Sequence, residues 1–241
     1  MKTSRPTRKS LTKSLASYRL KRDFNESPEP AGDKAAPKAT RGIFCVQKHL
    51  ATQLHYDFRL EHKGVLLSWA VPKGPSLNPK DKRLAMQVED HPIDYADFEG
   101  VIPSGYGAGV VMVWDRGTWT PDVDDIDVAL KKGELKFRLE GVKLKGSWVL
   151  VRTGQGKAWL LIKHRDEWSG DIDIATFAPR SVKSDDDLAQ ILKREKPDVW
   201  LQRGETEAHT DDKFRRAISR LPRTGRAGRA NKSPARTRRS K

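Results

Sequence analysis

The sequence predicts a mainly β fold: a compact antiparallel β-barrel-like domain with a few short helices and basic, disordered tails. Eight short runs rich in β-branched and aromatic residues fill the middle of the chain, separated by clusters of Gly, Pro or Asp. Both ends are instead rich in Lys, Arg, Ser and Pro. Hydrophobic residues make up only 36% of the 241 residues, so a well-filled core requires that part of the chain stays outside it.

The strands follow one another through short turns. His62-Lys63-Gly64 predicts a tight hairpin between the second and third strands, and Gly154-Gln155-Gly156 predicts another near the end of the barrel. The predicted strands are Ile43–Lys48, Leu54–His62, Val65–Val71, Arg83–Glu89, Gly109–Asp115, Glu134–Glu140, Ser147–Thr153 and Ala158–His164.

The chain divides into one domain between two tails. We expect residues 1–17 to be a disordered basic tail, 18–212 to form the domain, and 213–241 to be a second disordered basic tail. Ser184 and the three Asp residues after it predict the start of a helical extension. Composition makes most of 1–40 look loose, although Leu15–Leu20 favours a helical turn that docks on the body.

The excess positive charge lies in the tails. The formal net charge is +15; residues 1–41 contribute +7, residues 213–241 contribute +12, and the remaining middle carries −4. Basic tails attract polyanions through counterion release, which favours nucleic acid as a partner over a role in solubility alone. The single Cys45 and the lack of a long apolar run predict no disulfide and no membrane span, and favour a cytoplasmic, nucleoid-associated protein.

The most informative segment is the second predicted strand, Leu54–His62. Every second side chain on it is apolar and points to one face; these are Tyr56, Phe58 and Leu60. The opposite face carries His55, Asp57 and Arg59, about 7 Å apart along the strand. An imidazole and a carboxylate can share a divalent cation, and the guanidinium beside them can hold a phosphate oxygen.

His49, six residues upstream of His55, can supply a third ligand from the loop between the strands. Two histidines and one carboxylate leave open coordination positions, which is typical of a catalytic metal site. The ligand types suit Mn, Fe, Co or Zn. Two surface histidines beside an Asp57–Arg59 salt bridge fit this segment equally well.

Segments downstream add cations and another histidine. Lys73 lies in a Pro- and Gly-containing loop, Arg83 begins a strand that His91 follows, and a glycine-rich turn spans 100–109. Together they favour a phosphate bound near a metal, with His91 as a possible acid. A set of His55, Asp57 and His91 also fits the non-haem iron oxygenases, and the cations do not exclude an acidic cosubstrate.

A series of segments carries a pattern that is dense and ordered along the chain. They are Lys21–Phe24, Pro28–Gly32, Phe44–Glu61, Leu67–Pro75, Val88–Tyr95, Phe98–Pro103, Trp114–Trp119, Leu135–Leu139, Leu144–Gly146 and Trp159–Lys163. Over roughly 18–166, the chain closely resembles the 3′-phosphoesterase domain of bacterial and archaeal DNA ligase D. The resemblance implies a β-barrel-like fold and a Mn²⁺ site, with Co²⁺ or Zn²⁺ as alternatives. It also implies removal of a 3′-terminal ribonucleoside and then of the 3′-phosphate, which leaves a 3′-hydroxyl.

The resemblance assigns a role to each candidate residue. The metal ligands are His49, His55 and Asp57. The phosphate-binding residues are Arg59, His91 and Arg83, with His91 also as general acid. The catalytic residues are His91, Arg59, Lys73, Arg83, Tyr95, Asp23 and Glu29. The last two imply that residues 20–30 are ordered on the site, contrary to their composition.

This chain departs from the family pattern in one loop. Ile102–Gly109 lacks a glutamate that the family usually has and is one residue shorter, although no metal ligand is touched. A chain of 241 residues cannot hold the ligase and polymerase domains, so we expect a stand-alone form acting on duplex primer-template 3′ ends. A separate DNA ligase, polymerase or Ku is then the expected partner. The alternative function is a non-catalytic DNA-end-binding scaffold on the same fold.

Overall fold

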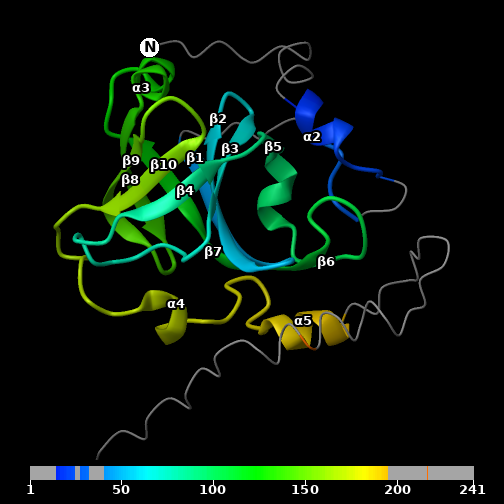
Figure 1. The fold of residues 1–241 in the computed structure, drawn as a ribbon. Helices are drawn as coiled ribbons and strands as arrows, with labels where there is room; N and C mark the ends of the chain where they lie inside the picture. Colours follow the sequence, from blue (N-terminus) through cyan, green and yellow to red (C-terminus); the bar gives the residue numbers. More distant parts are fainter. Residues whose placement is uncertain (1–14, 25–27, 33–40, 195–215, 217–241) are drawn as a thin grey trace, which may run out of the picture.

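The computed structural model describes residues 15–24, 28–32, 41–194 and 216 (Figure 1). Apart from 15–17 and 216, the two predicted tails lie outside the described residues, as do residues 195–212 of the predicted domain. None of the helices in the described part of the chain is long and apolar enough to cross a membrane.

Eight antiparallel strands close into a barrel, which confirms the predicted fold class (Figure 1). Their order is β1-β2-β3-β4-β10-β9-β8-β7, and β7 pairs with β1 to close the ring. Two short strands extend the sheet, β5 beside β3 and β6 beside β7. The bounds are β1 Gly42–Leu50, β2 Leu54–His62, β3 Val65–Val71, β4 Arg83–Gln87, β5 His91–Pro92, β6 Gly100–Ile102, β7 Gly109–Pro121, β8 Glu134–Gly141, β9 Lys145–Arg152 and β10 Ala158–Lys163.

The predicted hairpin between β2 and β3 is confirmed, and both strands have the predicted bounds. Lys63 and Gly64 have φ angles of 50° and 80°, the left-handed values that a two-residue turn between twisted strands requires. β1 is longer than predicted and runs to Leu50, so His49 lies on the strand and not in the loop. β5 and β6 were not predicted, because two or three residues are too few to show alternation.

Five short helices lie outside the barrel strands in the described part of the chain. The predicted helical turn near Leu15 is confirmed as α2, but the C-terminal helix begins at Leu188, and the prediction that Ser184 caps it is wrong. Asp185 has a φ of 61°, and Asp187 caps the helix by accepting a hydrogen bond from the Gln190 amide. The helices are α2 Ala16–Leu20, η1 Ile93–Asp97, α3 Ile126–Lys132, α4 Ile174–Phe177 and α5 Leu188–Arg194.

The barrel interior holds the main hydrophobic core. Its largest fully buried side chains are Trp69, Trp114, Trp148 and Trp159. The apolar face of β2 points into this core, as the alternation predicted; its members are Tyr56, Phe58 and Leu60. The opposite face of β2, which carries the candidate site, therefore lies on the outside of the barrel.

A second apolar cluster covers that outer face. Leu15 and Tyr18 of the N-terminal segment pack with Cys45 of β1, Leu66 of β3 and Tyr95 of η1. Figure 1 shows α2 beside β5 and the strands β2 and β3. The described parts of the N-terminal region are thus ordered against the barrel, as the family resemblance implied and the composition did not. Polar groups on this outer face are buried beneath the cover.

Replacing Tyr18 by Ala should release the N-terminal segment from the barrel. The Tyr18 side chain is 0% exposed and its hydroxyl donates to the Pro30 carbonyl. Removing the ring leaves a cavity, which should lower the free energy of unfolding by about 3–5 kcal/mol. We expect faster proteolysis within residues 15–32 and a lower melting temperature. Leu20→Ala is the matched control on α2, because Leu20 is 89% exposed. Equal protease resistance of both variants would contradict this packing.

Candidate metal and phosphate site

Strand register brings the candidate residues onto one patch of the outer face. In the β1–β2 pair, His49 is opposite His55, Gln47 is opposite Asp57 and Cys45 is opposite Arg59. Opposite residues in an antiparallel pair project to the same side of the sheet. The hairpin therefore gathers His49, His55 and Asp57 without any contribution from a distant loop.

These three side chains form the metal-ligand set that the sequence predicted. One ligand atom from each lies within 4.8 Å of the others. His49 Nδ1 is 3.5 Å from Asp57 Oδ2, and His55 Nε2 is 3.7 Å from Asp57 Oδ1. No other such group of His, Cys, Asp or Glu occurs in the part of the chain that the structure describes, so the rival set with His91 is not assembled.

Hydrogen bonds on the far side of each ring set the histidine tautomers. His49 Nε2 is 2.9 Å from the Gly107 carbonyl oxygen, and His55 Nδ1 is 3.0 Å from the Gln53 carbonyl oxygen. Because a carbonyl only accepts, each of these nitrogens donates its proton. In the neutral rings, His49 Nδ1 and His55 Nε2 then direct lone pairs at the Asp57 carboxylate. A divalent cation between them satisfies all three groups, so the residues present fit a metal.

Arg59 holds the carboxylate in place from behind. Its Nη2 donates to Asp57 Oδ2 at 3.1 Å, its Nε to Gln47 Oε1 at 2.8 Å and its Nη1 to Ser68 Oγ at 2.8 Å. The side chain is only 2% exposed. Each of the three guanidinium nitrogens therefore donates one hydrogen bond to the protein. In this state Arg59 orients the Asp57 carboxylate.

The same pair keeps Asp57 ionised. Burial alone would raise the pKa of the carboxyl, but the charge of Arg59 opposes it, and His49 and His55 lower the pKa further when their rings are protonated. The pKa of Asp57 therefore lies well below its ordinary value of 3.8. A buried carboxylate that is charged at neutral pH is a ready ligand for a cation.

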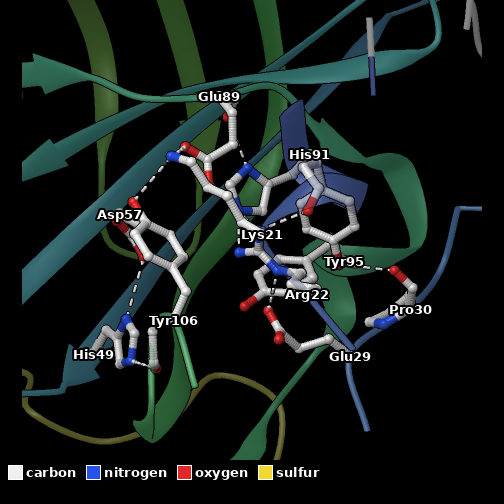
Figure 2. A network of polar contacts seen from close by, with 12 residues as sticks. Lys21, Arg22, Glu29, Pro30, His49, Asp57, Glu89, His91, Tyr95 and Tyr106 are labelled. Atoms are coloured by element: carbon white, nitrogen blue, oxygen red, sulfur yellow. Dashed lines mark hydrogen bonds and ion pairs between the residues drawn. The ribbon is translucent and has the colours of Figure 1, made fainter. Parts of the chain in front are cut away.

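A second polar network, centred on Arg22, lies beside the triad (Figure 2). Arg22 donates to Glu29 Oε1 at 2.8 Å and to Glu89 Oε1 at 3.3 Å, and its Nη2 is 3.2 Å from His91 Nε2. Lys21 binds the other oxygen of Glu89 at 2.9 Å. The N-terminal segment thus contributes two cations and one carboxylate to the wall of the site.

His91 is held in its neutral form by this network. Arginine only donates, so His91 Nε2 accepts from Arg22, and Nδ1 donates to the Glu89 carbonyl oxygen at 2.9 Å. Burial, and then the charges of Arg59 and Arg22, lower the pKa of His91 well below its ordinary value of 6.5. Nε2 therefore carries no proton in this state.

The remaining predicted residues take different places. Tyr95 is buried, with its ring 5.0 Å from the Arg59 guanidinium carbon and 4.9 Å from the His91 ring. Arg83 pairs with Asp81 at the start of β4, and its buried Nε lacks a hydrogen-bond partner among the described residues. Lys73 is exposed in the turn after β3, and Asp23 is exposed directly after Arg22.

Sequence reasoning missed several residues that build the site. Gln47 and Ser68 each bind Arg59, and Gln47 also donates to the Tyr95 and Phe98 carbonyl oxygens. A signal for Gln47 existed, because it alternates with buried apolar residues on β1 in phase with His49. No local pattern pointed to Arg22, since its partners are brought together only by the tertiary fold.

Comparison with known proteins agrees with this geometry. Residues 47–152, which hold His55, Asp57, Arg59 and His91, match the model of a family described as the DNA ligase D 3′-phosphoesterase domain. The barrel belongs to the DNA ligase D 3′-phosphoesterase domain family.

Two proteins similar to this chain are named for non-homologous end joining. The multifunctional non-homologous end joining protein LigD of Pseudomonas aeruginosa is 57% identical over 167 residues, which cover 67% of this chain and 20% of that protein. The LigD repair protein of Mycobacterium tuberculosis is 44% identical over 147 residues, or 61% of this chain and 19% of that one. The chain therefore spans about a fifth of the length of these relatives.

Disturbing Arg59 should weaken metal binding by this phosphoesterase domain. Arg59→Lys loses the forked contacts with Asp57, Gln47 and Ser68, and loss of such supporting contacts typically costs roughly 10–100-fold in metal affinity. Titration calorimetry with Mn²⁺ measures the effect, and circular dichroism verifies folding. Arg116→Lys is the control, since that Arg pairs with Asp97 on the surface. Unchanged affinity of Arg59→Lys would show that the guanidinium does not organise the ligands.

Neutral His91 predicts a specific loss of stability in mild acid. His91 takes up a proton near pH 6.5 in the unfolded chain but not in the folded chain. The free energy of unfolding therefore has its full value above pH 6.5 and decreases as the pH falls below it. The loss amounts to about 1.4 kcal/mol per pH unit below 6.5. Urea unfolding at pH 7.5 and 5.5 should show a smaller difference for His91→Gln than for the wild type. An identical difference in both proteins would mean that His91 is protonated in the fold.

Proposed function

We propose that this chain is a Mn²⁺-dependent phosphoesterase that processes 3′ ends of DNA. It removes 3′-terminal ribonucleosides and 3′-phosphates from primer-template ends and leaves a 3′-hydroxyl. The observation that carries the proposal is the convergence of His49, His55 and the ionised Asp57 beside a buried cationic network. Membership of a phosphoesterase family supports the same reaction class.

A divalent metal bound by His49, His55 and Asp57 would polarise the scissile phosphate and lower the pKa of water. The open ligand set of two imidazoles and one carboxylate suits Mn²⁺, and Co²⁺ and Zn²⁺ accept the same donors. Arg59 keeps Asp57 oriented and charged through one of its five N–H donors and is itself held by two more. The remaining two can donate to a phosphate oxygen.

The charge balance of the site favours an anionic substrate. Its cations and carboxylates are equal in number: Arg22, Lys21 and Arg59 face Glu29, Glu89 and Asp57. A divalent metal adds two positive charges, which a phosphate group then neutralises. The Arg83 Nε, buried without an acceptor, is a further donor that a phosphate oxygen can satisfy.

His91 can act as the acid only after substrate binds. In the resting site, the charges of Arg59 and Arg22 contribute to keeping His91 Nε2 unprotonated. A phosphate that approaches these arginines offsets their charge, which raises the pKa of His91 toward the range where it transfers a proton to the leaving oxygen. Tyr95 holds the His91 ring from one side.

Water is the nucleophile in this proposal. Ser68 beside Arg59 already donates its hydroxyl proton to the Leu66 carbonyl and accepts from the guanidinium. Burial raises the pKa of the nearby Cys45 thiol to about 12, and its side chain is 0% exposed. Neither side chain has a base beside it that activates it for attack.

DNA ends are the proposed substrate and the setting is end-joining repair. The basic tails supply affinity for duplex DNA that weakens with salt, and the relatives are end joining proteins by name. A separate ligase, a polymerase or Ku would act on the same ends, in the cytoplasm at the nucleoid. Lys73, exposed after β3, is proposed to contact the substrate backbone, and Asp23 to act with Glu29.

The proposal is tested with a 5′-labelled primer-template that ends in a 3′ ribonucleotide or a 3′-phosphate, with and without Mn²⁺. His55→Ala and Asp57→Ala should abolish both activities while DNA binding survives. His62→Ala is the matched control on β2, because His62 pairs with Asp127 away from the triad. Full activity of Asp57→Ala, or of wild type with chelator, would refute the metal site. DNA binding without product at any metal concentration would indicate a scaffold, and dependence on iron and O₂ an oxygenase.

A further inference from the structure

An exposed aromatic ring stands beside the metal-ligand triad, and no step above uses it. Tyr106 lies in the loop between β6 and β7 and is 51% exposed. Its neighbour Gly107 accepts the hydrogen bond from His49 Nε2, so the loop is anchored directly to a metal ligand.

Two glycines shape the loop backbone on either side of Tyr106. Gly105 and Gly107 flank Tyr106 with φ angles of 80° and 84°, in the left-handed region that favours glycine. A Cβ atom added at Gly105 would meet no atom within 4 Å. The space beside Gly105 is therefore open, and the adjoining Tyr106 side chain is half exposed.

Two cations of the N-terminal segment fix the ring. Lys21 Nζ lies 4.4 Å from the ring centroid and 3.4 Å from the hydroxyl, and the Arg22 guanidinium lies 5.7 Å from the centroid. Glu89 in turn holds both cations. Figure 2 shows Tyr106 and Lys21 between His49 and Asp57 of the triad and the residues of the Arg22 network. A ring held in this way, with half its surface accessible, is suited to stack against a flat partner.

If the triad binds a phosphate of a nucleic acid, the flat partner nearest to the ring is a nucleobase. Proteins that bind single strands or strand ends stack bases on aromatic rings, and this binding tolerates any base because each has a π face. The ring belongs to the wall that also holds the carboxylates of Glu29 and Glu89. These carboxylates are paired with Lys21 and Arg22, so this wall carries little net charge and suits an uncharged nucleoside better than a phosphate. The end of the substrate that has hydroxyls and no further phosphate is its terminal nucleoside.

We propose that Tyr106, clamped by Lys21, binds the 3′-terminal ribonucleoside by stacking and so favours its removal over removal of a 3′-phosphate. This inference rests on the proposed function, because it assumes that the triad acts on the phosphate 5′ to that nucleoside. A 3′-phosphate end has no nucleoside beyond the scissile bond. Tyr106 thus contributes to one of the two reactions and leaves the other unaffected.

The test compares kcat/KM for the two substrates in variants of this residue. Tyr106→Ala should lower ribonucleoside removal about tenfold or more, the range seen when a stacking ring is removed, and should change 3′-phosphate removal less than about twofold. Tyr106→Phe keeps the ring and should stay within about twofold on both substrates. Trp168→Ala is the matched control, an exposed aromatic over Lys145 and outside the triad and the Arg22 network.

Equal losses on both substrates would overturn the proposal, because they would mean that Tyr106 acts through the His49 loop or the primer strand. No loss on either substrate would overturn it as well. A binding measurement separates it from the proposed function. With chelator present, fluorescence anisotropy should show tighter binding of a ribonucleoside-ended primer than of the 3′-phosphate primer. Tyr106→Ala should remove that preference even if the wild type hydrolyses neither substrate, and an unchanged preference would refute the stacking contact.

Discussion

The buried ion pair of Arg59 and Asp57 is the interaction on which the rest of the site depends. Burial alone would raise the pKa of Asp57, and a neutral Asp57 is a poor metal ligand. Arg59 supplies the opposing positive charge, and Gln47 and Ser68 fix its orientation from two neighbouring strands. Because the strand register of β1–β3 sets all of these partners, the barrel and the ligand set are consequences of the same pairing.

The N-terminal segment supplies the charged side chains that the barrel strands do not. It brings Arg22 and Glu29 against His91 and so determines the protonation state of that ring before substrate binds. It also brings Lys21 to Tyr106, on the loop that holds His49. Packing of Tyr18 in the outer cluster is therefore coupled to the electrostatics of the site, although Tyr18 itself touches no metal ligand. The Arg59–Asp57 pair and the Arg22 network each carry equal numbers of positive and negative charges. A bound metal therefore adds a positive charge that a bound anion can neutralise.

Sequence reasoning predicted the parts of this structure that depend on local periodicity. The alternation in β2 separated Tyr56 and Phe58 from His55 and Asp57, and the Lys63-Gly64 turn fixed the register of β2 against β3. It placed His49 in a loop, because nothing local shows that β1 continues to Leu50. It failed for the N-terminal cover, whose polar composition conceals a few buried anchors, and for Arg22, whose partners are up to 69 residues away. Long-range polar networks leave no periodic signal, and the family resemblance was needed to expect order there.

The most direct test of this account is the position and coordination of a bound Mn²⁺ ion. Crystals grown with Mn²⁺, measured at a wavelength with strong anomalous scattering from that metal, locate it without reference to activity. The account predicts one peak within bonding distance of His49 Nδ1, His55 Nε2 and the Asp57 carboxylate, with Arg59 still bound to Asp57. Coordination through His49 Nε2, a peak away from these three side chains, or no peak would contradict it.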